Sequence, residues 1–349
     1  MSQTTTRGEE ILEPELPIVD AHHHLWDRPA HTRRNDAPQP ENAFQKVLAG
    51  TPRYLLDELI ADARGGHNVR ATVYMECRAM YRAGGPEHLR CVGETEFVNG
   101  IAAMTASGTY GDFRACAGIV GSTDLRLGDR VQEVLEAHLR AGGGRFRGVR
   151  QLGAYDADVS PEYSTPGLYL DPVFRSGFRY LGKLGLSFDA WVFEPQLADV
   201  IDLAQAFPNI SIILNHAGTP LGIGVYQGRR SERFPVWADH IRKLARCANV
   251  SVKLGGLGIP LLGFASFMAD PPAHSITLAD EWRPYIETCV DAFGPERCMF
   301  ESNYPADIGT ARYAVIWNAF KRIAARYSAE EKKALFSATA TAVYQLDVQ

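Results

Sequence analysis

Histidines close to the N-terminus have the spacing of a metal-binding pair. Asp20, His22, His23 and His24 belong to a short apolar segment, residues 18–24, that has the character of a β-strand. Because side chains alternate along a strand, we expect Asp20, His22 and His24 to share one face and His23 to point the other way. Two imidazoles in register suit a divalent metal, with zinc as the expected ion. The alternative is a pair of buried histidines held only by hydrogen bonds.

Two further side chains have the chemistry of substrate-binding groups. Arg147 and Arg150 lie three residues apart in a second apolar segment, so a regular strand sends them to opposite faces. Arg150 is nearer the segment's C-terminal end, and we expect its guanidinium to bind a substrate carboxylate. The alternative is a salt bridge to a neighbouring strand. Trp191 ends a third such segment, where it either walls a ring-shaped substrate or packs in the core.

These residues belong to a regular alternation of apolar segments and helical patterns. The eight segments are residues 18–24, 69–77, 115–122, 146–153, 186–192, 211–218, 250–256 and 298–303. Most are nearly continuous in apolar character, as parallel strands covered on both sides are. The pattern predicts a single α/β domain, a (β/α)8 TIM barrel over residues 17–349, preceded by a flexible arm, residues 1–16. A doubly wound sheet is disfavoured, because no G-x-G-x-x-G follows an early strand.

Long connections follow four of the predicted strands: residues 28–52, 154–170, 219–234 and 257–275. All four leave the C-terminal ends of strands, which carry the active site in a barrel of this kind. We therefore expect lids and specificity loops on that face.

Composition narrows the classes of partner. The chain has 349 residues, 46% hydrophobic, and a net charge of −5. No basic field is present to attract nucleic acid or an anionic membrane, so we expect a small-molecule substrate. The six cysteines form no C-x-x-C pair, and the N-terminus lacks the apolar core of a signal peptide. We expect a cytoplasmic protein with reduced thiols. Barrels of this kind often form dimers, so a homodimer is one assembly that the chain could form.

The opening IVDAHHHLWD resembles the start of the amidohydrolase superfamily. It is most similar to the amidohydrolase-2 branch, which includes sugar lactonases, 2-pyrone-4,6-dicarboxylate lactonase and 4-sulfomuconolactone hydrolase. LNHAGTPLGIG, VKLGGLG and CMFESNYPAD support the branch. The resemblance runs from the first strand to the C-terminus. It implies that His216, in the sixth segment, lies near the metal or the reacting carbonyl, as a third ligand, a proton donor or a carbonyl polariser. The alternative is a buried structural histidine.

The last strand departs from the family pattern. Relatives commonly read Gly-Ser-Asp-Trp-Pro there, and that aspartate activates the attacking water and often binds metal. This chain reads ESNYP, with Asn303 at the aspartate position. An amide accepts no proton at neutral pH and binds metal more weakly than a carboxylate. Glu301, two residues earlier on the same face, or Asp307, just beyond the strand, is expected to supply the carboxylate. The alternative for Glu301 is a pair with Lys253 or an arginine.

Three functions follow from these residues. The first is a hydrolase, a lactonase that opens a small carboxylated or sugar lactone, with Glu301 or Asp307 activating water and Asn303 orienting it. The second is a decarboxylase or hydratase acting on an aromatic or dienoic acid. The third is a non-catalytic barrel left by loss of the aspartate. Release of carbon dioxide would indicate the lyase, and an opened ring without loss of mass the lactonase.

Overall fold

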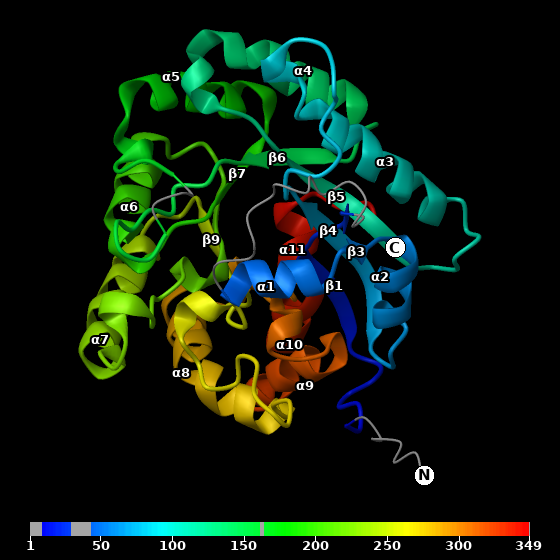
Figure 1. Ribbon diagram of the computed structural model, residues 1–349, viewed down its shortest axis with the longest axis vertical. Coiled ribbons are helices and arrows are strands. Elements are labelled where there is room, and N and C mark those ends of the chain that lie inside the picture. Colours follow the sequence, from blue (N-terminus) through cyan, green and yellow to red (C-terminus); the bar gives the residue numbers. More distant parts are fainter. Residues whose placement is uncertain (1–8, 29–42, 161–163, 349) are drawn as a thin grey trace.

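The fold is built on a ring of parallel strands. The computed structural model describes residues 9–28, 43–160 and 164–348. Eight strands pair side by side in this order: β1 (Pro17–His23), β4 (Asn68–Met75), β5 (Arg114–Ser122), β6 (Phe146–Arg150), β7 (Ser187–Ala190), β8 (Ile212–Leu214), β9 (Val250–Lys253) and β10 (Cys298–Met299). Figure 1 shows helices outside this ring. The arrangement confirms the predicted (β/α)8 barrel.

The ring closes through residues that follow β10 rather than through β10 itself. His24 N–H donates to the Tyr304 carbonyl at 2.8 Å, and Asn303 N–H donates to the His22 carbonyl at 2.9 Å. The histidine run and the ESNYP segment are therefore neighbours in the barrel wall. This closure brings together the two sequence motifs that were singled out for chemistry.

A helix follows each strand of the ring. The helices are α2 (Leu56–Ala63), α3 (Val92–Ala106), α4 (Val131–Ala141), α5 (Pro172–Leu184), α6 (Leu197–Ala206), α7 (Arg230–Leu244), α8 (Ser275–Phe293), α9 (Tyr313–Ala324), α10 (Ala329–Lys333) and α11 (Thr339–Val343). Between β1 and α2 lie α1 (Ala43–Gly50) and a small antiparallel pair, β2 (Trp26–Asp27) with β3 (Arg53–Tyr54). In the ranges that the structure describes, no helix is both long and apolar enough to cross a membrane.

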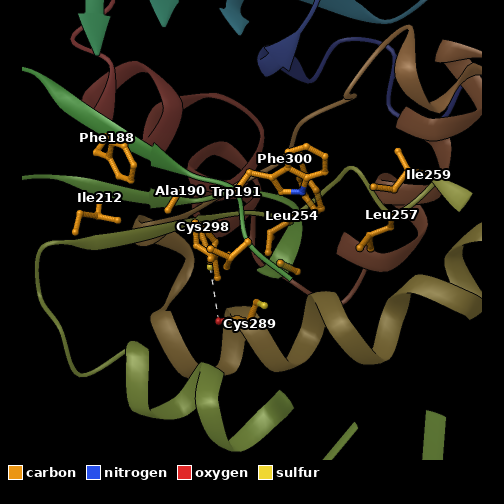
Figure 2. Packing of buried hydrophobic residues seen from close by; sticks show 14 of the residues in the cluster. Phe188, Ala190, Trp191, Ile212, Leu254, Leu257, Ile259, Cys289, Cys298 and Phe300 are labelled. Carbon is orange, nitrogen blue, oxygen red and sulfur yellow. Dashed lines mark hydrogen bonds between the residues drawn. The ribbon is translucent and has the colours of Figure 1, made fainter. Parts of the chain in front are cut away.

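Two apolar cores hold the barrel. The larger lies between strands and helices, and Figure 2 shows part of it, with Phe188 and Ile212 from strands. There the Cys298 thiol contacts the Cys289 carbonyl of α8 at 3.7 Å. All six cysteines are free thiols. Figure 2 also labels Trp191, which packs in the same cluster at the end of β7.

The smaller core fills the barrel interior and is completed by the C-terminus. Val19, Val73 and Ile213 from the strands pack with Tyr344 and Leu346, which follow α11. These C-terminal side chains therefore plug the barrel beneath the strand ends that carry the polar residues.

The predicted arm is partly attached. Residues 1–8 lie outside the described residues, but Leu12 and Glu13 contact α9. Lys321 Nζ donates to both of their carbonyls at 2.8 Å, and Leu12 N–H donates to Asn318 Oδ1 at 2.9 Å. The division into an arm and a barrel at residue 17 stays a prediction. Parts of two predicted loops, residues 29–42 and 161–163, also lie outside the described residues.

Candidate active site

A cavity opens at the C-terminal ends of the strands, on the face predicted from the loop lengths. It measures about 280 Å³ and is lined by polar side chains from several strand ends, among them His24, Glu76, Arg150, His216 and Asn303. Its size suits a small-molecule ligand, and its polar groups converge from separate strands as catalytic groups do in barrel enzymes.

Strand β1 delivers its histidines through an irregularity. The pairing register of β1 with β4 shifts between Asp20 and His23, and this resets the alternation of faces. Asp20 does not face the same way as His22, contrary to the prediction. Its carboxylate accepts from Ser302 Oγ at 2.6 Å and from Tyr313 Oη of α9 at 3.0 Å, behind the barrel wall. Asp20 therefore anchors the closing segment and takes no part in the cavity.

His23 points outward, as predicted. Its Nε2 lies 2.8 Å from Thr72 Oγ1 on β4, and its ring meets that of Tyr74 edge-on. Burial lowers the pKa of His23 to about 3, so the ring is neutral. It is a structural histidine of the outer core.

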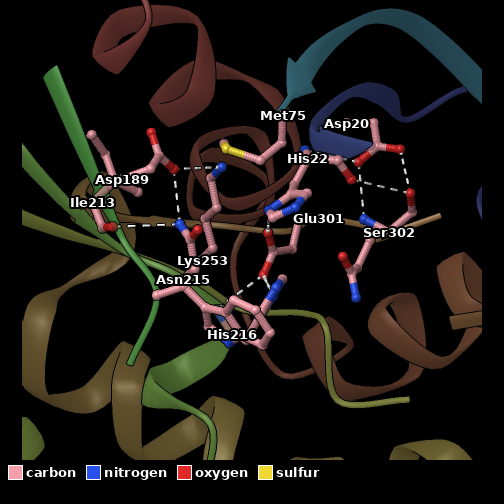
Figure 3. A network of polar contacts seen from close by, with 12 residues as sticks. Asp20, His22, Met75, Asp189, Ile213, Asn215, His216, Lys253, Glu301 and Ser302 are labelled. Atoms are coloured by element: carbon pink, nitrogen blue, oxygen red, sulfur yellow. Dashed lines mark hydrogen bonds and ion pairs between the residues drawn. The ribbon is translucent and has the colours of Figure 1, made fainter. Parts of the chain in front are cut away.

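Glu301 bridges two histidines. Its Oε2 lies 2.7 Å from His22 Nδ1, and its Oε1 lies 2.7 Å from His216 Nδ1 (Figure 3). Oε1 also accepts the His216 backbone N–H at 3.2 Å. Oε1 thus takes part in two hydrogen bonds, whereas Oε2 lies at ion-pair distance from His22 Nδ1 without the geometry of a hydrogen bond, and the side chain is fully buried. Glu301 fixes both rings with Nδ1 toward itself, an orientation typical of carboxylates behind catalytic or metal-binding histidines.

The hydrogen bonds of His22 and His24 define their tautomers. His24 Nδ1 lies 2.9 Å from the Met75 carbonyl, which can only accept, so Nδ1 carries the proton. His22 Nε2 lies 3.5 Å from Arg150 Nη1, which can only donate. Burial lowers the pKa of both imidazoles well below the usual value, so both are neutral. Each Nε2 therefore carries a lone pair, and the two Nε2 atoms are only 3.2 Å apart.

Asn303 adds a third acceptor. Its Oδ1 lies 3.3 Å from His24 Nε2, and its Nδ2 donates to Asp307 Oδ1 at 2.6 Å. The other Asp307 oxygen accepts Gly258 N–H at 2.9 Å. Asp307 thus lies behind Asn303 and holds its amide with the oxygen toward the histidines. Among the described residues around the cavity, neither Asp307 nor Glu301 forms part of the lining.

The three acceptors fit a divalent metal. Ligand bonds of about 2.0–2.1 Å in a tetrahedral site place ligand atoms about 3.3 Å apart. His22 Nε2 lies 3.2 Å from His24 Nε2, and His24 Nε2 lies 3.3 Å from Asn303 Oδ1. A second grouping, His22, His216 and Glu301, has its ligand atoms within 4.8 Å of one another. Its two contacts of 2.7 Å are shorter than the spacing of ligand atoms around one tetrahedral ion, so the Nε2 grouping has the better spacing for a metal.

The balance of buried charge favours the same conclusion. Four buried carboxylates lie in or beside the barrel interior: Glu76, Asp189, Glu301 and Asp307. Arg150 pairs with the first at 2.7 Å and Lys253 with the second at 2.9 Å. In the part of the chain that the structure describes, Glu301 and Asp307 have no Lys or Arg partner. Burial raises the pKa of Asp307 to about 8, the response of a carboxylate without a nearby cation. A buried carboxylate without a cationic partner, as Glu301 is among the described residues, suits a nearby divalent ion.

Arg150 pairs with a carboxylate that follows β4, two strands away from its own strand β6, and its expected contact with a substrate carboxylate stays a prediction. Its Nε donates to Glu76 Oε1 at 2.7 Å and its Nη2 to the Glu76 carbonyl at 2.6 Å. It also lines the cavity, with its guanidinium carbon 5.8 Å from the centre of the Trp191 ring. Trp191 is 92% buried yet reaches the lining, and its Nε1 donates to Thr219 Oγ1 at 2.9 Å. Both residues line the cavity, and their contacts with a substrate stay predictions.

Lys253 belongs to a separate polar cluster deeper in the barrel. Its Nζ lies 2.9 Å from Asp189 Oδ1, and Asn215 Nδ2 donates to the same oxygen at 2.8 Å (Figure 3). Tyr344 Oη from the C-terminal plug also donates to Asp189 at 2.9 Å. The alternative proposed for Glu301, a pair with Lys253, is therefore not what the structure shows. Lys253 neutralises Asp189 instead.

Several site residues have left-handed backbone. The φ angles are +55° at His216, +50° at Ala217 and +52° at Asn303. Residues with a Cβ seldom adopt this conformation, and such strain gathers at functional sites. No sequence pattern indicated this strain, nor the role of Gly256, which gives His216 its space. Arg28 and Arg78, which also line the cavity, were not singled out either. Both arginines lie just beyond the C-terminal ends of predicted strands, and this position could have identified them.

Comparison with known proteins agrees with this geometry. The chain matches the amidohydrolase-2 family model, described as Amidohydrolase, over residues 19–346. It is 31% identical to the uncharacterized protein y4mH of Sinorhizobium fredii, covering 95% of this chain and 99% of that one. It is 30% identical to an L-fucono-1,5-lactonase of Burkholderia multivorans, covering 94% and 96%. A crystal structure of a Burkholderia multivorans amidohydrolase with bound zinc superposes with a TM-score of 0.70 at 27% identity, covering 94% and 99%.

The protein belongs to the amidohydrolase-2 family. The family and its lactonase-named relative make it an enzyme of hydrolase type. The resemblance first seen in the opening motif is thereby confirmed over the whole barrel.

Proposed function

We propose that the protein is a metal-assisted lactonase that opens a small cyclic ester with water. One observation carries the proposal: Glu301 holds His216, which lines the cavity, and His22, whose Nε2 lies 3.2 Å from His24 Nε2, which in turn lies 3.3 Å from Asn303 Oδ1. Glu301 thus contacts both the proposed base, His216, and one of the proposed metal ligands, His22. The lactonase among the relatives and the zinc in the similar crystal structure support the same reaction class.

His22, His24 and Asn303 are the residues that would hold the metal, and zinc is the ion we propose. Such an ion, when bound, polarises a carbonyl oxygen and lowers the pKa of water. Asp307 orients Asn303 toward it by accepting the amide N–H at 2.6 Å. Glu301 and Met75 present His22 and His24 with lone pairs at Nε2.

His216 is the proposed general base. With Nδ1 bonded to Glu301, its Nε2 is the ring nitrogen left to face the cavity. Nε2 takes a proton as water oxygen bonds to the lactone carbonyl carbon, and Glu301 stabilises the resulting imidazolium at 2.7 Å. The tetrahedral intermediate then collapses. The bond from that carbon to the ring oxygen breaks, and the ring oxygen takes the proton back from His216.

Arg150 and Trp191 would position the ring. The Arg150 guanidinium is held by Glu76 and is 95% buried, so its direction is fixed before a substrate arrives. Trp191 offers a flat apolar wall beside it. Together they favour a planar or ring-shaped substrate.

A lactone panel tests the proposal. Purified enzyme loaded with zinc or manganese is offered sugar lactones and unsaturated lactones, and acid release is followed at constant pH. We expect at least one lactone to open with a mass gain of one water, and His216→Asn to lower kcat by about 10²-fold or more. Carbon dioxide from aromatic acids, with no lactone opened, would overturn the proposal in favour of a lyase. Elemental analysis of His22→Ala, with loss of one metal equivalent, tests the ligands independently.

A further inference from the structure

The charged groups that line the cavity are unequal in number. Three arginines, Arg28, Arg78 and Arg150, contribute to the wall, against one carboxylate, Glu76. Glu76 is already paired with Arg150 at 2.7 Å. Within the described ranges, Arg28 and Arg78 have no carboxylate within salt-bridge distance. Among the described residues, these two guanidiniums therefore have no carboxylate partner in a cavity whose other walls are largely apolar.

These two arginines lie toward the outside of the cavity. Arg78 is exposed and Arg28 is half-buried, whereas Arg150, His24 and His216 are all more than 90% buried. The deep groups surround the proposed reaction centre. The positive charge of Arg28 and Arg78 thus lies at the mouth of the cavity. It belongs to the same cavity wall as the deep groups but lies away from the bond that is cleaved.

The loop that carries Arg78 at the cavity mouth is held in one shape by hydrogen bonds. Its φ is +60°, an unfavourable value for a residue with a side chain. Glu94 of α3 enforces this shape: its Oε1 accepts Cys77 N–H at 2.8 Å and Ala79 N–H at 2.9 Å, the residues on either side of Arg78. Glu94 itself is 99% buried. A strained residue gripped on both sides by a buried carboxylate is typical of a functional position.

Arg28 is also preoriented. Its guanidinium carbon lies 4.8 Å from the centre of the Trp26 ring, which is itself part of the cavity wall. Stacking on an aromatic face limits the conformations of the guanidinium and leaves its edge N–H groups free to donate. An arginine edge in this arrangement matches the two oxygens of a carboxylate.

We propose that the substrate is a lactone carrying a carboxylate, which Arg78 and Arg28 bind at the cavity mouth while the ring carbonyl meets His216. The inference rests on the proposed lactonase function and specifies its substrate class. L-fucono-1,5-lactone, the compound in the relative's name, has no charged group and would leave both arginines without a counter-ion. This chain is therefore expected to prefer acidic lactones over neutral ones.

Matched pairs of lactones test the preference. Galactaro-1,4-lactone and galactono-1,4-lactone differ only in a carboxylate against a hydroxymethyl group, and muconolactone is compared with its methyl ester. In any pair that is turned over, we expect kcat/KM to favour the acid by about tenfold or more, mainly through KM. Arg78→Ala should reduce this ratio toward one, Arg78→Lys should keep part of it, and added salt should weaken it.

Two controls separate charge recognition from general effects. Arg140→Ala removes the same charge from a side chain that is 70% exposed on α4, and should leave the ratio as it is. Arg28→Ala should act as Arg78→Ala does. A neutral lactone hydrolysed as fast as its acid, or a ratio that survives loss of both arginines, would overturn the inference while the lactonase function stands.

A binding measurement distinguishes failure of the lactonase proposal from failure of the proposed anion site. Galactarate, the ring-opened dicarboxylate, is titrated calorimetrically into the metal-loaded enzyme and into Arg78→Ala. If no lactone is hydrolysed but galactarate binds and the variant loses at least tenfold in affinity, the reaction is wrong and the anion site is right. If the wild type does not bind it, the anion site is wrong as well.

Discussion

Gly256 lies directly against the imidazole of His216. A Cβ added to Gly256 would lie 1.9 Å from His216 Nδ1, the atom that bonds to Glu301. The φ of Gly256 is +62°, which also favours glycine. The position therefore accepts only glycine as long as the His216–Glu301 contact is kept.

Replacing this glycine should remove activity. In Gly256→Ala the His216 ring must leave Glu301, so we expect kcat to fall by about 10²-fold or more and the unfolding free energy to fall by about 1–3 kcal/mol. Gly100→Ala is the control, because nothing lies within 4 Å of its added Cβ on α3. That change should stabilise by roughly 0.5–1 kcal/mol. Steady-state rates and denaturant unfolding report both, and an active Gly256→Ala would contradict the assigned role of His216.

Glu301→Gln tests whether one carboxylate orients two rings. A carboxylate accepts from both Nδ1–H groups, whereas an amide can accept from only one and must donate toward the other. One ring is then forced to the other tautomer, so we expect kcat to fall by about 10²–10⁴-fold with KM little changed. Zinc content should fall if the altered ring is His22. Glu133→Gln, a 62% exposed carboxylate, is the matched control. An unaltered kcat would show that Glu301 serves the fold alone.

Asn303→Asp should strengthen metal binding at the expense of the metal-free fold. A carboxylate oxygen is a better ligand than an amide oxygen, so we expect at least about tenfold tighter zinc binding in a chelator competition. The Asn303 amide now donates to Asp307 at 2.6 Å, and two carboxylates there would repel each other without a metal. Asp307→Asn added to Asn303→Asp reverses the pair and should restore metal-free stability. Unchanged zinc affinity would place the ion elsewhere.

The fold was predictable because its signals are local. All eight strands lie within the predicted apolar segments or overlap them, since a strand buried on both sides must be apolar along its length. A capping box at the start of α10 depends on equally local residues: the Ser328 and Glu331 side chains each accept the other's backbone N–H, at 3.2 and 2.7 Å.

The site was predictable only as far as strand alternation holds. His22 and His24 converge as expected, but the register shift after Asp20 moved that carboxylate behind the wall, and a bulge leaves no mark in residue type. Glu301 and Asp307 were identified as carboxylates of the site, yet their partners come from β1 and the loop after β9. Those contacts depend on how the barrel closes, which spacing along the chain does not contain.

Glu94 should make stability depend on pH. Burial, with the charge of Glu76 as a second cause, raises the pKa of Glu94 to about 7 in the folded protein, against an ordinary value of 4.5. A carboxylate with a raised folded pKa contributes stability below pH 4.5 and loses it as the pH rises through 7. Glu94→Gln keeps an oxygen for the Tyr74, Cys77 and Ala79 donors but never ionises.

We therefore expect Glu94→Gln to gain stability over the wild type as the pH rises from about 5 to about 8, by on the order of 3 kcal/mol at most. Glu96→Gln on the same helix is the control with the opposite sign. The Arg82 side chain lowers the pKa of Glu96, so removing that carboxylate should cost stability at neutral pH and not at acid pH. Denaturant unfolding at both pH values measures the four differences. If the stability of both variants follows the same trend with pH, the ionisation of buried Glu94 does not control the stability of the loop that carries Arg78.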